Sequence, residues 1–147
     1  MTGEEMLIGT KGDYGVRAMI DLARHHTGQP IPRNEIASRR HIPEAYLDQL
    51  LGLLRRAGFI KSVRGPGGGH LLARNDDEIT LLSLLETLEG SLEPMSSLDK
   101  ELDVTGQAWI WTEIYHRMRE SLEDVTLGRL VEVEKASEAA SAPRYLI

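Results

Sequence analysis

The 147-residue sequence contains no cysteine. Disulfide bonds, thiolate nucleophiles, zinc fingers and cysteine-held iron–sulfur clusters are therefore excluded. A chain of this length does not need such cross-links, because a domain of about 150 residues buries roughly 68–70% of the surface that its unfolded form exposes. We expect one domain-sized core rather than two.

Long hydrophobic runs are also missing, since no stretch reaches the roughly 18 apolar residues of a membrane-spanning helix. The first residues include Glu4 and Glu5, where a signal peptide requires positive charge. We therefore expect a soluble, cytoplasmic protein with no membrane partner. With 41% hydrophobic and 27% charged residues, the composition is that of a globular chain rather than a disordered one.

The net charge of −6 argues at first against a nucleic-acid partner. The charges are unevenly divided, however: residues 10–74 contain 11 Lys and Arg against 5 Asp and Glu, whereas residues 75–147 contain 6 against 16. A basic N-terminal half suggests a module that binds a polyanion. The alternative is that the charges cluster by chance on solvated faces.

A buried first helix is predicted from Thr10, whose hydroxyl could cap it, to about His25. Its apolar residues surround most of the helix axis, which is typical of a helix packed on several sides. A short helix at 33–40 follows, and a third begins near Pro43, which suits a first turn. The third helix has one apolar stripe, comprising Leu47, Leu50, Leu51 and Leu54. Its opposite face is small or polar, so the two short helices resemble a helix-turn-helix.

A β-hairpin is predicted next, because strand-forming residues at 59–64 and 70–74 flank the glycine-rich turn at 65–69. A hairpin that directly follows a recognition helix is typical of the wing of a winged helix. A helix at 80–88 closes this region. The predicted fold is therefore mainly α with a small β-hairpin: a winged helix-turn-helix domain over residues 7–90.

The remaining sequence predicts a loop at 91–106, dimerisation helices at 107–134 and a flexible tail at 135–147. Apolar residues recur at heptad spacing in the first of these helices, and a last short helix begins at Thr126. This seam could pack within the chain or against a second copy. We favour a homodimer, because the winged helix already has leucine stripes for its own core. The expected interface residues are Trp111, Ile114, Tyr115, Met118, Leu122 and Val125.

The candidate DNA-binding residues lie on the third helix and the wing. Gln can pair with adenine, Asp can accept from cytosine, and an arginine on a narrow loop can enter the minor groove. The alternative for each is a solvated surface side chain. The expected contacts to double-stranded DNA are Arg33, Arg39, Arg40, Ala45, Tyr46, Asp48, Gln49, Arg56, Lys61, Arg64, Gly67 and Gly68.

No enzyme chemistry is indicated. The glycine-rich turn lacks the Lys-Ser/Thr ending of a P-loop and precedes a strand rather than a helix. The five histidines have no metal-ligand spacing, and Ser, His and Asp form no recognisable nucleophile arrangement. We expect no catalytic residues, no metal site and no cofactor.

Three segments carry a family resemblance: residues 10–19 (TKGDYGVRAM), 42–50 (IPEAYLDQL) and 54–70 (LRRAGFIKSVRGPGGGH). Together they resemble the Rrf2 family of bacterial transcription regulators, over about residues 7–133. The resemblance implies a homodimeric winged helix-turn-helix protein on a palindromic operator. It also implies that Tyr46, Asp48 and Gln49 read bases in the major groove and that Arg64 enters the minor groove.

The sequence departs from the family at its sensing site. Sensing members have three cysteines in the loop before the dimerisation helix, and this chain has none. Ala108 stands where one branch has a histidine, and Asp13 matches an acidic ligand of another branch but has no thiolate beside it. The expected effector is a small molecule or a protein, if one exists.

Two functions remain open from the sequence. The first is a sequence-specific DNA-binding regulator, expected to be a repressor. The alternative is an interaction module whose partner is a metabolic enzyme or another regulator. The basic residues favour DNA, because a protein-binding module has no need of them.

Overall fold

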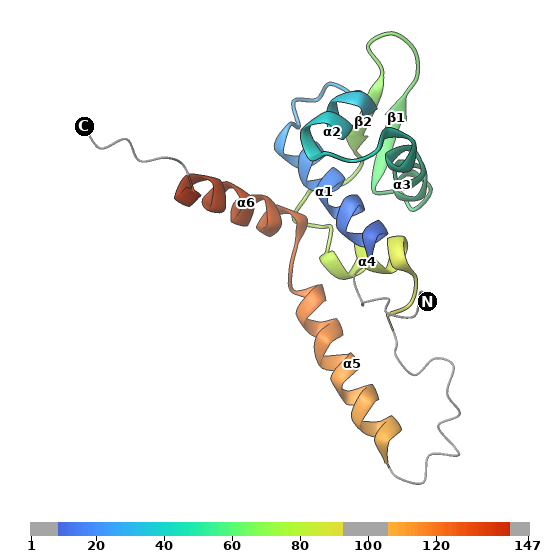
Figure 1. Cartoon of the computed structure of the whole chain (residues 1–147), viewed down its shortest axis with the longest axis vertical. Coiled ribbons are helices and arrows are strands. Elements are labelled where there is room, and N and C mark those ends of the chain that lie inside the picture. Colours follow the sequence, from blue (N-terminus) through green and yellow to red (C-terminus); the bar gives the residue numbers. More distant parts are fainter. Residues whose placement is uncertain (1–8, 93–105, 142–147) are drawn as a thin grey trace, which may run out of the picture.

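The computed structural model describes residues 9–92 and 106–141. The elements follow the order α1 (Thr10–Arg24), α2 (Arg33–Arg40), α3 (Glu44–Arg56), β1 (Ile60–Val63), β2 (Gly69–Leu72), α4 (Leu81–Glu89), α5 (Gln107–Glu123) and α6 (Leu127–Ser141). Helices α1–α4 and the hairpin form one body, from which α5 and α6 project in different directions (Figure 1). The structure thus confirms the predicted mainly helical fold with one small hairpin. Within the described ranges, none of the helices combines the length and apolar character needed to cross a lipid bilayer.

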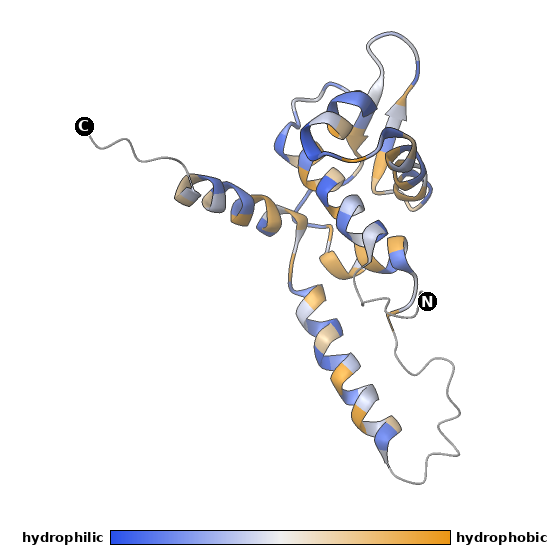
Figure 2. Ribbon diagram, in the orientation of Figure 1, coloured by the Kyte–Doolittle hydropathy of each residue, from blue (hydrophilic) through white to orange (hydrophobic). Residues whose placement is uncertain are grey.

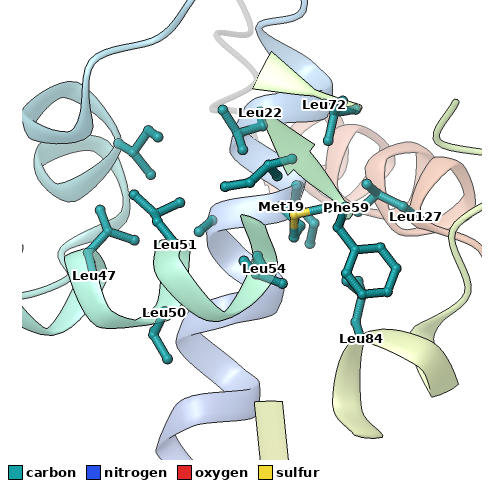
Figure 3. Packing of buried hydrophobic residues seen from close by; sticks show 14 of the residues in the cluster. Met19, Leu22, Leu47, Leu50, Leu51, Leu54, Phe59, Leu72, Leu84 and Leu127 are labelled. Atoms are coloured by element: carbon teal, nitrogen blue, oxygen red, sulfur yellow. The ribbon is translucent and has the colours of Figure 1, made fainter. Parts of the chain in front are cut away.

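The core lies where α1, α3 and the base of the hairpin meet (Figure 3). The predicted stripe of α3 is buried, and it packs with Met19 and Leu22 of α1. Phe59, Leu84 and Leu127 bring the hairpin, α4 and α6 into the same cluster. Helix α1 is buried on several sides, as its apolar pattern predicts.

Helices α1 and α4 approach closely because Gly12 and Gly15 face α4. A Cβ atom at Gly15 would collide with the side chain of Leu88, and one at Gly12 would lie 2.9 Å from Oε1 of Glu89. The prediction that Thr10 caps α1 is wrong: Gly9 is the N-cap residue and no side chain of the cap bonds the helix. The carboxylate of Glu89 instead accepts from the N–H groups of Gly9 and Gly12.

The hairpin is antiparallel, with Ile60 opposite Leu72 and Val63 opposite Gly69. Ile31 pairs with His70 on the other side of β2, through hydrogen bonds of 2.9 and 2.8 Å. A Cβ atom at Gly69 would collide with the carbonyl of Ile31, so this close approach requires glycine. The wing is therefore attached to the segment that leads into α2.

The two C-terminal helices contact different parts of this body. Tyr115, Met118 and Leu122 of α5 pack against a second apolar cluster, formed by Leu82, Leu85 and Leu92. Helix α6 is longer than predicted: the expected flexible tail begins at residue 135, but the helix continues to Ser141. Glu134 and Glu138, one turn apart, both bond Arg24 and hold this extension of about two turns. Most of the predicted 91–106 loop, residues 93–105, lies outside the described residues.

Candidate nucleic-acid interface

Helices α2 and α3 are joined by a three-residue turn. His41 takes the left-handed backbone conformation, with φ of 54°, and Ile42 after it is buried. The N–H of Ile42 donates to the carbonyl of Ala37 at 3.0 Å and closes the end of α2. Pro43 is the N-cap residue, so α3 begins at Glu44, one residue after the predicted start. The turn directs α3 across α2, as in a helix-turn-helix.

The outward face of α3 carries three of the predicted base-reading residues. Ala45, Asp48 and Gln49 are all exposed, opposite the buried leucine stripe. A recognition helix meets base edges with residues of its first turns. The structure therefore brings Ala45, Asp48 and Gln49 together on one surface.

Arg33 connects the start of α2 to this face. Its Nη1 donates to Oδ1 of Asp48 at 2.6 Å, and its Nε donates to Oε1 of Glu44 at 3.2 Å. The carboxylate of Asp48, followed by that of Glu44, raises the pKa of Arg33 above its ordinary value. Arg33 thereby balances two carboxylates that would otherwise repel phosphates at this surface.

Tyr46 lies at the edge of the same helix but is half-buried. Its ring packs edge-on against that of Tyr14, with centroids 5.8 Å apart. Burial, and then the nearby charge of Glu89, raise the pKa of the Tyr46 hydroxyl above 10. Tyr46 therefore packs α3 on α1, and only part of its ring faces outward.

Arg39 and Arg40 are bound to a buried carboxylate. Asp21 of α1 is 0% exposed and accepts from Nε and Nη2 of Arg39 at 3.0 and 2.8 Å. Nε of Arg40 donates to the same carboxylate at 3.0 Å. The Arg40 side chain is only 15% exposed and also reaches Glu134 of α6. Both arginines thus have internal partners that the sequence did not indicate, because Asp21 is 18 or more positions away.

The wing presents an exposed, basic tip. Gly65 and Gly67 have φ of 91° and 75°, and a Cβ at Gly68 would collide with the carbonyl of Val63, so the turn requires these glycines. Lys61 and Arg64 are exposed on the hairpin. Their side chains pair with no acidic residue within 9–92 and 106–141, and the same is true of two arginines that end α3, Arg55 and Arg56. Arg55 is not among the predicted contacts, although its place beside Arg56 could have indicated it.

His70 lies where the wing meets α3. Its Nδ1 is 2.8 Å from Oγ of Ser62 across the hairpin. Burial lowers the pKa of His70 below 6.5, and the charges of Arg55 and Arg33 lower it further. Two arginines of the candidate interface, Arg55 and Arg33, therefore lie near enough to His70 to disfavour its protonated form.

The predicted dimer residues of α5 divide into two groups. Tyr115, Met118 and Leu122 are half-buried against α4, the intramolecular arrangement that the sequence left open. Trp111 and Ile114 are about half exposed. Trp109 and Ile110, which the heptad pattern missed, are also exposed, so apolar side chains remain uncovered near the start of this projecting helix (Figure 2). Val125 is half-buried where α5 ends, and its carbonyl accepts from Leu81.

Comparison with known proteins agrees with this architecture. The profile of the Rrf2 family, described as an iron-dependent transcriptional regulator, matches residues 8–133. The chain is 38% identical over 125 residues to the HTH-type transcriptional regulator CymR of Bacillus subtilis, covering 85% of this chain and 89% of that protein. It is 36% identical over 134 residues to the HTH-type transcriptional regulator IscR of Sodalis glossinidius, covering 88% and 81%.

Solved structures give the same result. The structure of CymR, the global cysteine regulator of B. subtilis, superposes with a TM-score of 0.76 at 36% identity, covering 88% of this chain and 98% of that one. T. potens IscR superposes with a TM-score of 0.75 at 36% identity, covering 97% and 95%. The resemblance found in the three sequence segments is confirmed, and the chain belongs to the Rrf2 family of transcriptional regulators.

Proposed function

We propose that this chain is a homodimeric transcriptional repressor that binds a palindromic operator in the cytoplasm. A DNA-binding regulator is what family membership supports, and the alternative of a module for a metabolic enzyme is not favoured. The observation that carries the proposal is the surface formed by α3 and the adjoining hairpin (Figure 1). There, exposed polar side chains of α3 adjoin four cations without acidic partners in the described ranges.

In this proposal, α3 enters the major groove and the wing enters the minor groove. Gln49 and Asp48 face base edges, while Ala45 offers a methyl contact. Arg64 reaches the minor groove, where the phosphates of both strands deepen the negative potential. The remaining cations, with the backbone of Gly67 and Gly68, contact phosphates and set the register.

Three of the predicted arginines have carboxylate partners within the chain and contribute less to phosphate binding in this proposal. Arg39 and Arg40 are held by Asp21, so they serve the interface by fixing α2. Arg33 is exposed and can bind phosphate only by sharing its guanidinium with Asp48 and Glu44. We therefore expect phosphate contacts to depend on Arg55, Arg56 and Lys61 more than on these three.

Dimerisation follows from the uncovered apolar side chains of α5. Ile110, Trp111 and Ile114 lie at spacings that place them on one side of a helix, and each is 46–51% exposed. Burying such a face against its two-fold mate stabilises the pair at about 25 cal/mol per Å² of apolar surface. A two-fold dimer places two α3 helices for two half-sites, which is why we propose a palindromic operator.

The residues of this chain do not fit an iron–sulfur cluster, although the family description mentions iron. The sequence supplies no thiolate. In the part of the chain that the structure describes, no three His, Asp or Glu side chains gather as a metal site. Asp13 is exposed and pairs with Arg17 at 2.8 Å. In this proposal, regulation therefore does not involve an iron–sulfur cluster.

A small molecule or a protein is the proposed class of effector. A surface hollow of about 410 Å³ lies between the end of α1 and the connection from β2 to α4, lined in part by His26, Arg74 and Glu78. Its size lies within the range of small-ligand pockets.

Selection of bound fragments from the source genome tests the proposal. Fragments that share an inverted repeat, bound by a species of about twice the 16.4 kDa chain mass in light scattering, are the expected result. An Ile114→Glu variant should be monomeric and lose operator affinity. His116→Glu is the control, because it adds the same charge on the opposite side of α5. A persistent monomer, or fragments with no common sequence, would contradict the proposal.

A further inference from the structure

The C-terminal part of α6 is attached to the helix-turn-helix by charge. Leu127 and Val131, in the first turns of α6, are buried in the core. Farther along, Oε1 of Glu134 accepts from Nη1 of Arg24 at 2.7 Å, and Oε2 accepts from Nη1 of Arg40 at 2.7 Å. Glu134 thus joins α6 to the last residue of α1 and the last residue of α2 at once.

These contacts complete an ion-pair network of three arginines and four carboxylates. Asp21 accepts from Arg39 and Arg40, and Glu35 also pairs with Arg39 at 3.4 Å. Helix α6 supplies the other two carboxylates, Glu134 and Glu138. Without α6, Arg24 would lose both of its carboxylate partners in the described ranges, and Arg40 would keep only Asp21, which it shares with Arg39, an arrangement disfavoured by like-charge repulsion.

Arg40 connects this network to the recognition helix. It is the last residue of α2, and the turn of His41, Ile42 and Pro43 follows it directly before α3 begins. Its side chain is held by Asp21 on one side and Glu134 on the other. The path from Glu134 to the start of α3 therefore runs through one side chain and a three-residue turn.

We propose that Glu134 is a positioning residue for DNA recognition: by holding Arg40 on Asp21, it fixes the turn that orients α3. Helix α6 then does more than extend the C-terminus, because it sets the geometry of an interface that it does not touch. Glu134 itself contacts no base or phosphate in this proposal.

The loss of a positioning contact and the loss of a negative charge should change DNA affinity in opposite directions. Removing a negative charge from a DNA-binding protein should raise its affinity for every duplex. A positioning residue acts oppositely, because its loss weakens the specific complex while leaving the general attraction intact. The neutral, nearly isosteric Glu134→Gln distinguishes the two. The matched control is Glu132→Gln, a loss of the same charge from an exposed position of the same helix with no ion pair in the described ranges.

The experiment uses the full-length protein and two fluorescent duplexes of about 30 base pairs. One is recovered by selection with the parent protein from a random pool, and the other has the same composition in shuffled order. Glu134→Gln should lower affinity for the selected duplex by about three- to tenfold, without lowering affinity for the shuffled one. Glu132→Gln should raise both slightly. If Glu134→Gln behaves as Glu132→Gln does, or lowers both affinities equally, the proposal is wrong.

Two further variants test the route through Arg40. In an Arg40→Gln background, Glu134→Gln should have no additional specific effect, because its partner on α2 is gone. Glu138→Gln removes a carboxylate that bonds Arg24 but not Arg40, and should leave the selected-to-shuffled affinity ratio unchanged. An undiminished effect of Glu134→Gln without Arg40 would show that it acts through Arg24 instead and would overturn the proposal.

Discussion

The carboxylate of Glu89, at the end of α4, caps the first turn of α1 by accepting from the N–H of Gly12, 77 positions earlier in the chain. The same oxygen accepts from the N–H of Gly9 at 3.1 Å. Two free donors of a helix N-terminus are thereby satisfied by a residue from another helix, and its negative charge also suits the positive end of the helix dipole.

We predict that Glu89→Ala lowers the free energy of unfolding by about 1–2 kcal/mol, the cost of losing a helix cap. Urea denaturation of the variant should show a lower midpoint with an unchanged slope. Glu120→Ala is the control, because Glu120 is exposed on α5 and its side chain has no ion pair in the described part of the chain. Equal midpoints for the two variants would contradict a capping role.

Replacing His41 should raise the free energy of unfolding, whereas replacing Glu89 should lower it. It is the one residue other than glycine with positive φ in residues 9–92 and 106–141, and its side chain is exposed. A side chain in the left-handed region costs about 1–2 kcal/mol, partly offset by the greater chain entropy that glycine loses on folding. His41→Gly should therefore stabilise the protein by about 0.5–1 kcal/mol in thermal and urea unfolding. A less stable variant would show that the imidazole stabilises the turn.

Periodicity and glycine content were enough to predict the elements that contact their sequence neighbours. The leucine stripe of α3 predicted its buried face, and the glycines at 65–69 predicted the turn of the wing. Contacts between distant segments were not predictable in this way. Nothing local marks Asp21 as the buried partner of Arg39 and Arg40, or Glu89 as the cap of α1.

The apolar heptad positions of α5 also show that a local pattern does not identify a distant partner. The spacing identified apolar positions, but spacing does not say what covers them. In the structure Leu82, Leu85 and Leu92 cover Tyr115, Met118 and Leu122, whereas Trp111 and Ile114 remain exposed. The unpredicted end of α6 is held likewise by Arg24, 110 positions before Glu134, which no local pattern could indicate.

His70 should make stability depend on pH. Its pKa in the folded protein lies below the ordinary 6.5, first because it is buried and then because Arg55 and Arg33 are near. The unfolded chain therefore binds the proton more readily, and stability is lost as pH falls from about 6.5 through the folded-state value. His70→Gln should flatten the loss of stability below about pH 6.5, as measured by urea midpoints. An unchanged pH profile would show that another group is responsible.

Arg64 and Gln49 should affect DNA binding in different ways. Arg64→Ala should weaken binding to a selected operator by about 1–3 kcal/mol if the side chain enters the minor groove. Gln49→Ala should instead relax the base preference at one position in each half-site while preserving most of the affinity for unrelated duplexes. The measurement is fluorescence anisotropy over a range of salt concentrations, with single-base variants of the operator.

The control for both variants is Arg129→Ala, which removes an exposed cation of α6 that has no ion pair in the described ranges. The loss of charge is the same as in Arg64→Ala, but the position lies outside the proposed interface, so only a small, sequence-independent decrease is expected. Counterion release should make the parent's affinity fall steeply with salt, and Arg64→Ala should reduce that slope by about one contact. If Arg64→Ala and Arg129→Ala had equal effects, the wing would contribute charge only, and the minor-groove contact would have to be abandoned.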